Sequence, residues 1–97
     1  MATLHLFRNA PEVIAVAAGK YIFRKGEVAR VMYLIIEGDV DLLLGETVVE
    51  TAGQGSFIGE MALIDDEARS ASARARSDCR VFPIDEELLE ALGRIKW

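Results

Sequence analysis

One stretch of the sequence combines a glycine, a carboxylate and an arginine at a spacing that could hold an anion. Gly59 and Glu60 precede a short run of helix-forming residues that starts at Met61, and Arg69 begins the strand-like segment after it. A glycine lets the backbone approach a ligand closely, and the first turn of a helix presents unpaired N–H groups. Arg69 could aim its guanidinium at the same anion, while Glu60 could accept hydrogen bonds from adjacent hydroxyl groups. A sugar phosphate is such a ligand, because it carries an anionic group flanked by hydroxyl groups.

Other interpretations of these charges are simpler. Taken alone, Glu60 and Arg69 could form a surface ion pair, which is common and contributes little. The acidic run Asp65, Asp66 and Glu67 is expected to be a solvated turn and not a metal site. The only histidine, His5, lies ahead of the strand-rich region, so a nucleophilic Ser or Cys would lack a base there. We therefore expect no enzymatic activity and no metal or other cofactor.

The composition narrows the class of protein further. The 97 residues carry a formal net charge of −5, whereas nucleic-acid and membrane-surface proteins need clustered Lys and Arg, so neither partner is expected. The apolar run at residues 13–18 is too short to span a bilayer, and a cytoplasmic location follows. The single cysteine, Cys79, allows no intrachain disulfide and is expected to be a small buried hydrophobe.

Glycines separate short runs of strand-forming residues over most of the chain. Gly38-Asp39 and Gly45-Glu46 are expected to reverse the chain tightly between neighbouring strands. Pro83 places the last strand at a sheet edge, because proline cannot donate to a strand ladder. Short strands with frequent turns favour an antiparallel sandwich or barrel. The predicted strands are residues 21–23, 31–36, 40–44, 47–51, 70–76 and 80–84.

Two helical segments complete the prediction. Residues 61–64 are dense in helix formers and indicate a single turn. Residues 86–95 form a C-terminal helix that Asp85 can cap, after a barrel at about residues 19–85. Its apolar side chains share one face at helical spacing and are expected to pack onto the barrel. They are Leu88, Leu89, Leu92 and Ile95.

The stretch around Arg69 resembles the phosphate-binding cassette of the cyclic-nucleotide-binding domain family. Members include the catabolite activator, regulatory subunits of cyclic-nucleotide-dependent kinases, and cyclic-nucleotide-gated channels. Residues 57–63 (Phe-Ile-Gly-Glu-Met-Ala-Leu) and Arg69-Ser70-Ala71 match the cassette, with its loop length preserved. Residues 33–40 and Lys25-Gly26-Glu27 resemble the glycine turns of the family's early strands. The resemblance covers roughly residues 19–92.

This resemblance implies a mainly β fold, an antiparallel jelly-roll-like β-barrel (double-stranded β-helix) with a short phosphate-binding helical turn and a short C-terminal helix. It implies that Arg69 pairs with the cyclic phosphate, that Glu60 accepts a hydrogen bond from the ribose 2′-hydroxyl, and that backbone N–H groups complete the cradle. Ser70, a hydroxyl residue after the arginine, favours cAMP over cGMP. The expected ligand-binding set is Gly59, Glu60, Met61, Ala62, Arg69, Ser70 and Ala71.

The sequence departs from the family at two places. Ser56 stands where the family often has Asp, at the expected loss of a turn hydrogen bond. The segment after the barrel is short, so the helix that serves as a lid over the base in the family is missing or reduced. Trp97 could stack on a base, or be a loose terminal aromatic.

The predicted function is binding of a cyclic nucleotide by one regulatory or sensor domain spanning residues 1–97. No output module is recognisable in the sequence, so a signal would pass through a protein effector, or the chain would be one piece of a larger assembly. A monomer is favoured. Two alternatives stay open: a degenerate domain of the same kind that serves protein docking, and a cupin-like metalloprotein on a similar barrel. The second would need two or three histidine ligands.

Overall fold

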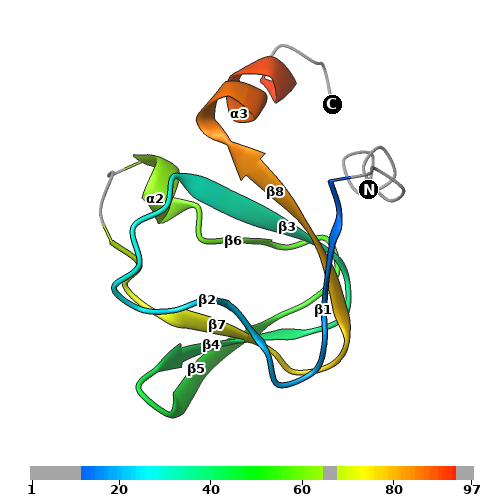
Figure 1. Ribbon diagram of the computed structural model, residues 1–97, viewed down its shortest axis with the longest axis vertical. Helices are drawn as coiled ribbons and strands as arrows, with labels where there is room; N and C mark the ends of the chain where they lie inside the picture. The colour runs from blue at the N-terminus through cyan, green and yellow to red at the C-terminus, as the bar shows by residue number, and fades with distance from the viewer. Residues whose placement is uncertain (1–11, 65–67, 94–97) are drawn as a thin grey trace.

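The strands form two antiparallel four-stranded sheets that face each other (Figure 1), and the computed structural model describes residues 12–64 and 68–93. The first sheet has the order β1 (Ile14–Val16), β8 (Cys79–Asp85), β3 (Val31–Glu37) and β6 (Phe57–Ile58). The second has the order β2 (Tyr21–Phe23), β7 (Ser72–Ala75), β4 (Val40–Leu44) and β5 (Thr47–Ala52). Apart from the β4–β5 hairpin, each connection crosses between the sheets. The jelly-roll-like β prediction is confirmed.

Apolar side chains bury both faces of the first sheet. Ile35 of β3 points into the inter-sheet core with residues of both sheets, whereas its neighbours Leu34 and Ile36 belong to a second cluster on the outer face. Alternation along one strand therefore serves two cores, which explains the unbroken apolar run of β3. The inter-sheet core consists of Phe23, Ile35, Val40, Ala52, Ile58, Ala73, Ala75, Cys79 and Val81.

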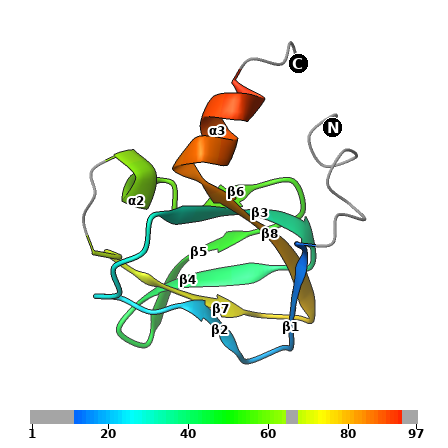
Figure 2. The same ribbon diagram turned by 45° about the horizontal axis from the view of Figure 1, so that its top comes forward.

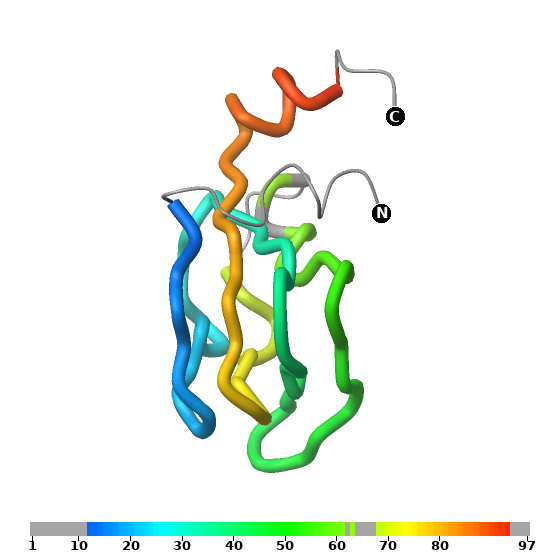
Figure 3. The backbone as a smooth tube through the Cα atoms, turned by 90° about the vertical axis from the view of Figure 1, so that its right-hand side faces the viewer, coloured from blue at the N-terminus to red at the C-terminus, as the bar shows by residue number. Residues whose placement is uncertain are grey.

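Two helices, α2 (Met61–Ile64) and α3 (Glu86–Leu92), lie over that outer face (Figure 2). Leu63 of α2 and Leu88 of α3 pack against the same outer cluster. Figure 3 shows α3 continuing from β8 beyond the end of the strands. Neither helix in the described part of the chain is long and apolar enough to cross a membrane.

The predicted capping of α3 is confirmed, and its packing is confirmed in part. The Asp85 Oδ1 accepts a hydrogen bond from the Leu88 backbone N–H at 2.7 Å. Leu92 is buried, but Leu89 is 42% exposed, so the prediction that Leu89 packs onto the barrel is wrong. The helix turns every 3.6 residues, and with only two turns Leu89 falls outside the contact face.

The prediction that Pro83 marks an edge strand is also wrong. Strand β8 lies between β1 and β3 in the sheet. However, β1 pairs with β8 only from Cys79 to Val81, whereas Pro83 pairs with Tyr33 on the other side. In the described chain β8 therefore has one paired neighbour at Pro83, and the missing N–H breaks no ladder bond towards β1.

Two short strands, β1 and β6, were not predicted, because a strand of two or three residues has too little periodicity to identify. The burial predicted for Cys79 is confirmed, since the residue is 3% exposed. The predictions for His5, for Asp65, Asp66 and Glu67, and for Ile95 and Trp97 lie outside the described residues.

Candidate functional site

The turn after β2 fixes the backbone of Arg69. Its N–H donates to the Glu27 carbonyl at 2.8 Å, and its carbonyl accepts from the Gly26 N–H at 2.8 Å. The Lys25 N–H donates to the Ser72 Oγ at 2.9 Å, just beyond the arginine. Two segments far apart in the sequence therefore hold the start of β7 in place, and they set the direction in which the arginine side chain leaves the backbone.

The Arg69 side chain turns inward, and its hydrogen-bond and ring partners among the described residues are neutral. The residue is 5% exposed. Its Nη1 donates to the Gly59 carbonyl at 3.0 Å, and its Nη2 donates to the Val31 carbonyl at 2.6 Å. The guanidinium carbon lies 4.2 Å from the centroid of the Phe23 ring. The Arg69 Nε is buried without a hydrogen-bond partner, and no carboxylate of the described residues forms an ion pair with this arginine.

Burial has an electrostatic cost at this arginine. Desolvation lowers the pKa of Arg69, while the nearby Tyr33 and Glu27 oppose that shift. A guanidinium nevertheless stays protonated in proteins, so the site holds a full positive charge. Carbonyl oxygens and an aromatic face stabilise that charge in part but do not cancel it. An anion that reached the guanidinium would therefore gain more here than at a solvated arginine.

Gly59 is required where it meets Arg69. Its φ is +75°, in the left-handed region that glycine adopts without strain. A Cβ at this position would lie 2.5 Å from the Arg69 Nη1 and 3.2 Å from Cε2 of Phe23. In the structure the Gly59 backbone closely approaches the Arg69 side chain, and its predicted approach to a ligand stays a prediction.

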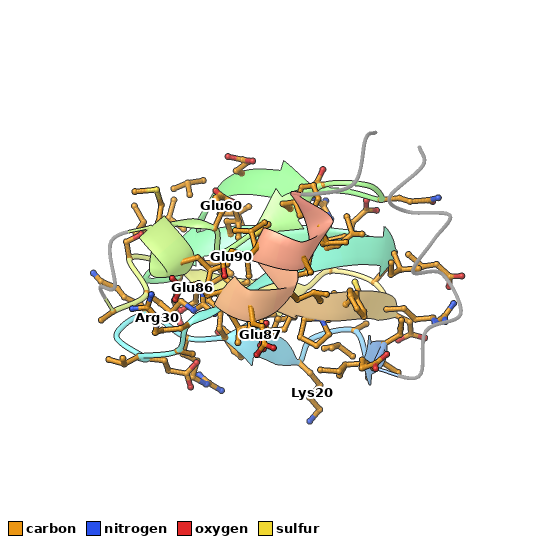
Figure 4. All side chains as sticks on the ribbon, turned by 90° about the horizontal axis from the view of Figure 1, so that it is seen from above. Lys20, Arg30, Glu60, Glu86, Glu87 and Glu90 are labelled. Carbon is orange, nitrogen blue, oxygen red and sulfur yellow. The ribbon has the colours of Figure 1, made fainter. Side chains whose placement is uncertain are left out.

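Glu60 lies next to this contact in the sequence but does not pair with Arg69. It is exposed, and within the described residues its side chain has no hydrogen bond or ion pair. Seen from above, it is well separated from the Arg30–Glu86 ion pair, whose atoms are 2.7 Å apart (Figure 4). The simpler interpretation, a surface ion pair between Glu60 and Arg69, is therefore wrong.

The other predicted ligand-binding residues lie around this contact. Met61 is 53% exposed at the start of α2, where Ala62 follows it. Ser70 is exposed and Ala71 half-buried, between Arg69 and the start of β7. Their contacts with a ligand stay predictions. Within the described residues 12–64 and 68–93, no group of three or more His, Cys, Asp or Glu side chains could hold a metal ion.

Sequence reasoning missed two partners of Arg69, the Phe23 ring and the Val31 carbonyl. A signal for Phe23 existed, because it immediately precedes the Arg24–Glu27 turn that holds the Arg69 backbone. The Val31 carbonyl carried no signal, since any residue type supplies the same backbone oxygen.

Comparisons with known proteins agree with this geometry. Residues 13–95 match the family model described as cyclic nucleotide-binding domain. The cAMP-dependent protein kinase regulatory subunit of Eremothecium gossypii is 35% identical over 77 residues, which are 79% of this chain and 17% of that protein. The chain therefore spans about a fifth of the curated relatives it matches.

Solved structures give the same result. The catabolite activator protein of Thermus thermophilus superposes with a TM-score of 0.78 at 32% identity, covering 96% of this chain and 46% of that one. An EAL enzyme solved in cAMP-bound and cGMP-bound forms superposes with TM-scores of 0.75 and 0.74 at 30% identity, covering 87% of this chain and 24% of the enzyme.

Proposed function

Because the chain belongs to the cyclic nucleotide-binding domain family, we propose that it binds cAMP in preference to cGMP and acts as a regulatory or sensor module. The observation that carries the proposal is the buried Arg69 guanidinium, whose partners among the described residues are all neutral. A cyclic phosphate carries one negative charge and would supply a countercharge to this guanidinium.

The proposed roles follow from position. The phosphate pairs with the Arg69 guanidinium and takes over hydrogen bonds now made to the Gly59 and Val31 carbonyls. Glu60, with its side chain unpaired within the described residues, accepts from the ribose 2′-hydroxyl. Backbone N–H groups near Gly59, Ala62 and Ser70 complete the cradle. Met61 and Ala71 line it.

The preference for cAMP rests on Ser70 and on the relatives. Ser70 is exposed and follows Arg69 directly, which supports a contact between its hydroxyl and a ligand atom. Two of the curated relatives are cAMP-dependent regulatory subunits, although the EAL enzyme was solved with either nucleotide. Nothing in the proposed chemistry breaks a bond of the ligand, so the module has no enzymatic activity of its own.

Paired calorimetric titrations with cAMP and cGMP test the proposal. The wild-type protein should bind cAMP with a Kd of about 1 μM or tighter, and cGMP more weakly. Arg69→Ala should bind neither. Equal, weak binding by the wild type and the variant would refute cyclic-nucleotide binding, and tighter binding of cGMP would refute the preference alone.

A melting experiment separates a sensor from a degenerate docking domain. A ligand that binds the folded state raises the melting temperature, with a stabilisation that grows as the logarithm of its concentration. Saturating cAMP should therefore shift the melting temperature of the wild type and leave that of Arg69→Ala unchanged. A wild-type protein that ignores cAMP would favour the docking alternative.

A further inference from the structure

The Phe23 ring packs against the guanidinium of Arg69. The guanidinium carbon of Arg69 lies 4.2 Å from the centroid of the ring. The same ring would meet a Cβ placed on Gly59 at 3.2 Å. Phe23 is 7% exposed and belongs to the inter-sheet core, so its ring is a fixed surface and not a mobile side chain at a rim.

A second aromatic side chain supports that surface. The Phe23 and Tyr33 rings stack with centroids 6.2 Å apart and an interplanar angle of 21°. Phe23 is on β2 of one sheet and Tyr33 on β3 of the other. Tyr33 pairs in register with Ile58, the residue before Gly59. The stacked rings therefore bridge the two sheets directly beneath the contact between Gly59 and Arg69.

The choice of an aromatic partner has an electrostatic consequence. A ring face attracts a cation through its quadrupole, most strongly where both groups are desolvated, and it carries no net charge. A carboxylate in the place of Phe23 would hold the guanidinium as firmly, but it would cancel the charge that an incoming anion must meet. The ring thus fixes the position of Arg69 and leaves its charge available.

We propose that Phe23 is a positioning residue for anion binding, whose ring holds the buried Arg69 guanidinium in place for the phosphate of the ligand without forming an ion pair with it. This inference rests on the proposed function and adds to it a residue outside the cassette. It predicts that the electron density of the ring, and not only its volume, sets the affinity for the cyclic nucleotide.

Fluorination of the ring separates these two properties. Replacing Phe23 with 3,4,5-trifluorophenylalanine keeps nearly the same shape and apolar character but weakens the negative face of the ring. The affinity for cAMP, measured by calorimetry, should fall about tenfold. Phe23→Leu removes the ring altogether and should weaken binding at least as much. A purely structural role would leave the fluorinated protein with wild-type affinity.

Two matched controls use the same chain. Tyr21→Leu removes an arginine–aromatic contact from the same strand, because the Arg24 guanidinium carbon lies 3.9 Å from the Tyr21 ring centroid. A register shift between Tyr21 and Phe23 puts Tyr21 opposite Arg74, on the outer face of the sheet. Val81→Ala loosens the inter-sheet core from β8, where Val81 pairs with Ile14 and Ile35. Both controls should bind cAMP with unchanged affinity.

The outcomes distinguish the inference from the function beneath it. If wild-type protein binds no cyclic nucleotide, both are overturned. If it binds cAMP, and the fluorinated and wild-type proteins bind equally, only the role of Phe23 is overturned. If Phe23→Leu fails to fold by circular dichroism, the fluorinated variant decides alone. A loss of affinity in Val81→Ala as large as in the fluorinated protein would also overturn the inference.

Discussion

Two arginines flank strand β7 and meet opposite surroundings. Arg69 precedes the strand, is 5% exposed, and is held by two carbonyl oxygens and an aromatic ring. Arg76 follows the strand on the outer face of the sheet, with 63% of its side chain exposed. Its Nη1 lies 3.7 Å from the Asp41 Oδ1 and 3.4 Å from the Thr51 Oγ1. Among the described residues, Arg69 is buried and forms no ion pair, while Arg76 is solvated and paired.

The difference in surroundings gives the two charges different energetics. Water already screens Arg76, so its ion pair with Asp41 adds little. Arg69 is only 5% exposed, so solvent screens its charge far less, and burial of that charge carries a desolvation cost that a bound anion would offset. The chain can bury a carboxylate beside an arginine, as it does with Asp41, which is 7% exposed. Its described residues place no carboxylate in an ion pair with Arg69, which supports the proposal that this position receives an anionic ligand.

The largest expected effect comes from removing the buried charge. Arg69→Met keeps a long apolar side chain but should lower the affinity for cAMP about 100-fold or more, since charge-assisted hydrogen bonds contribute about 1.5–3 kcal/mol each. The free energy of unfolding should fall by no more than about 1 kcal/mol, because the desolvation cost of the charge disappears with it. Calorimetry and urea unfolding measure the two quantities. Intact affinity with a large loss of stability would reverse the interpretation of Arg69.

Gly59→Ala should disturb the same site through the backbone. The substitution places a Cβ 2.5 Å from the Arg69 Nη1 at a φ of +75°. We expect about 1–2 kcal/mol lower stability from the left-handed backbone and about tenfold weaker binding of cAMP. Gly45→Ala is the matched control, because its φ is +63° with no atom within 4 Å of the added Cβ. It should lose stability alone, and weaker binding in this control would remove Gly59 from the site.

Thr51→Val probes the buried carboxylate of the outer face. The Thr51 hydroxyl donates to the Asp41 Oδ1 at 2.8 Å, and losing a partner of a buried polar group costs about 1–3 kcal/mol. Because this network lies away from Arg69, the free energy of unfolding should fall by about 1 kcal/mol while the affinity for cAMP stays unchanged. A change in affinity would show that the two arginines are coupled.

Arg76→Ala should have the smallest effect. An exposed ion pair contributes about 0–1 kcal/mol, so the free energy of unfolding should shift by less than about 0.5 kcal/mol, and less at high salt. The affinity for cAMP should stay within about twofold of the wild-type value, a smaller change than the loss of one charge-assisted hydrogen bond would cause. If Arg76→Ala weakened binding as much as Arg69→Met, the contrast between the two cations would fail.

Local patterns in the sequence predicted much of the fold. Strand β4 and helix α2 have the predicted bounds, because each is framed by clear turn or cassette residues. The strand predicted from residue 70 begins only at Ser72, since Arg69 bonds to the turn at Gly26 and Glu27 instead of extending the sheet. The position of Pro83 could not be predicted, because it depends on where β1 stops pairing.

The site was predictable only in part for a similar reason. The cassette pattern predicted that Gly59 and Arg69 act together, and their atoms are in contact in the structure. The contact between Phe23 and Arg69 depends on the register shift in β2, which turns Phe23 towards the inter-sheet core. Such a shift is a property of pairing between distant strands, and no local spacing encodes it.

The burial of Cys79 makes its thiol a reporter of how often the folded protein opens locally. Cys79 is the only cysteine of the chain and lies in the same inter-sheet core as Phe23. Burial raises the pKa of its thiol, and thiol reagents attack an accessible thiolate. Chemical labelling of the native protein therefore requires an opening that exposes the thiol, and the labelling rate reports how often that opening occurs. A bound cyclic nucleotide that links the start of β7 to the cassette should lower the rate at which Cys79 is labelled.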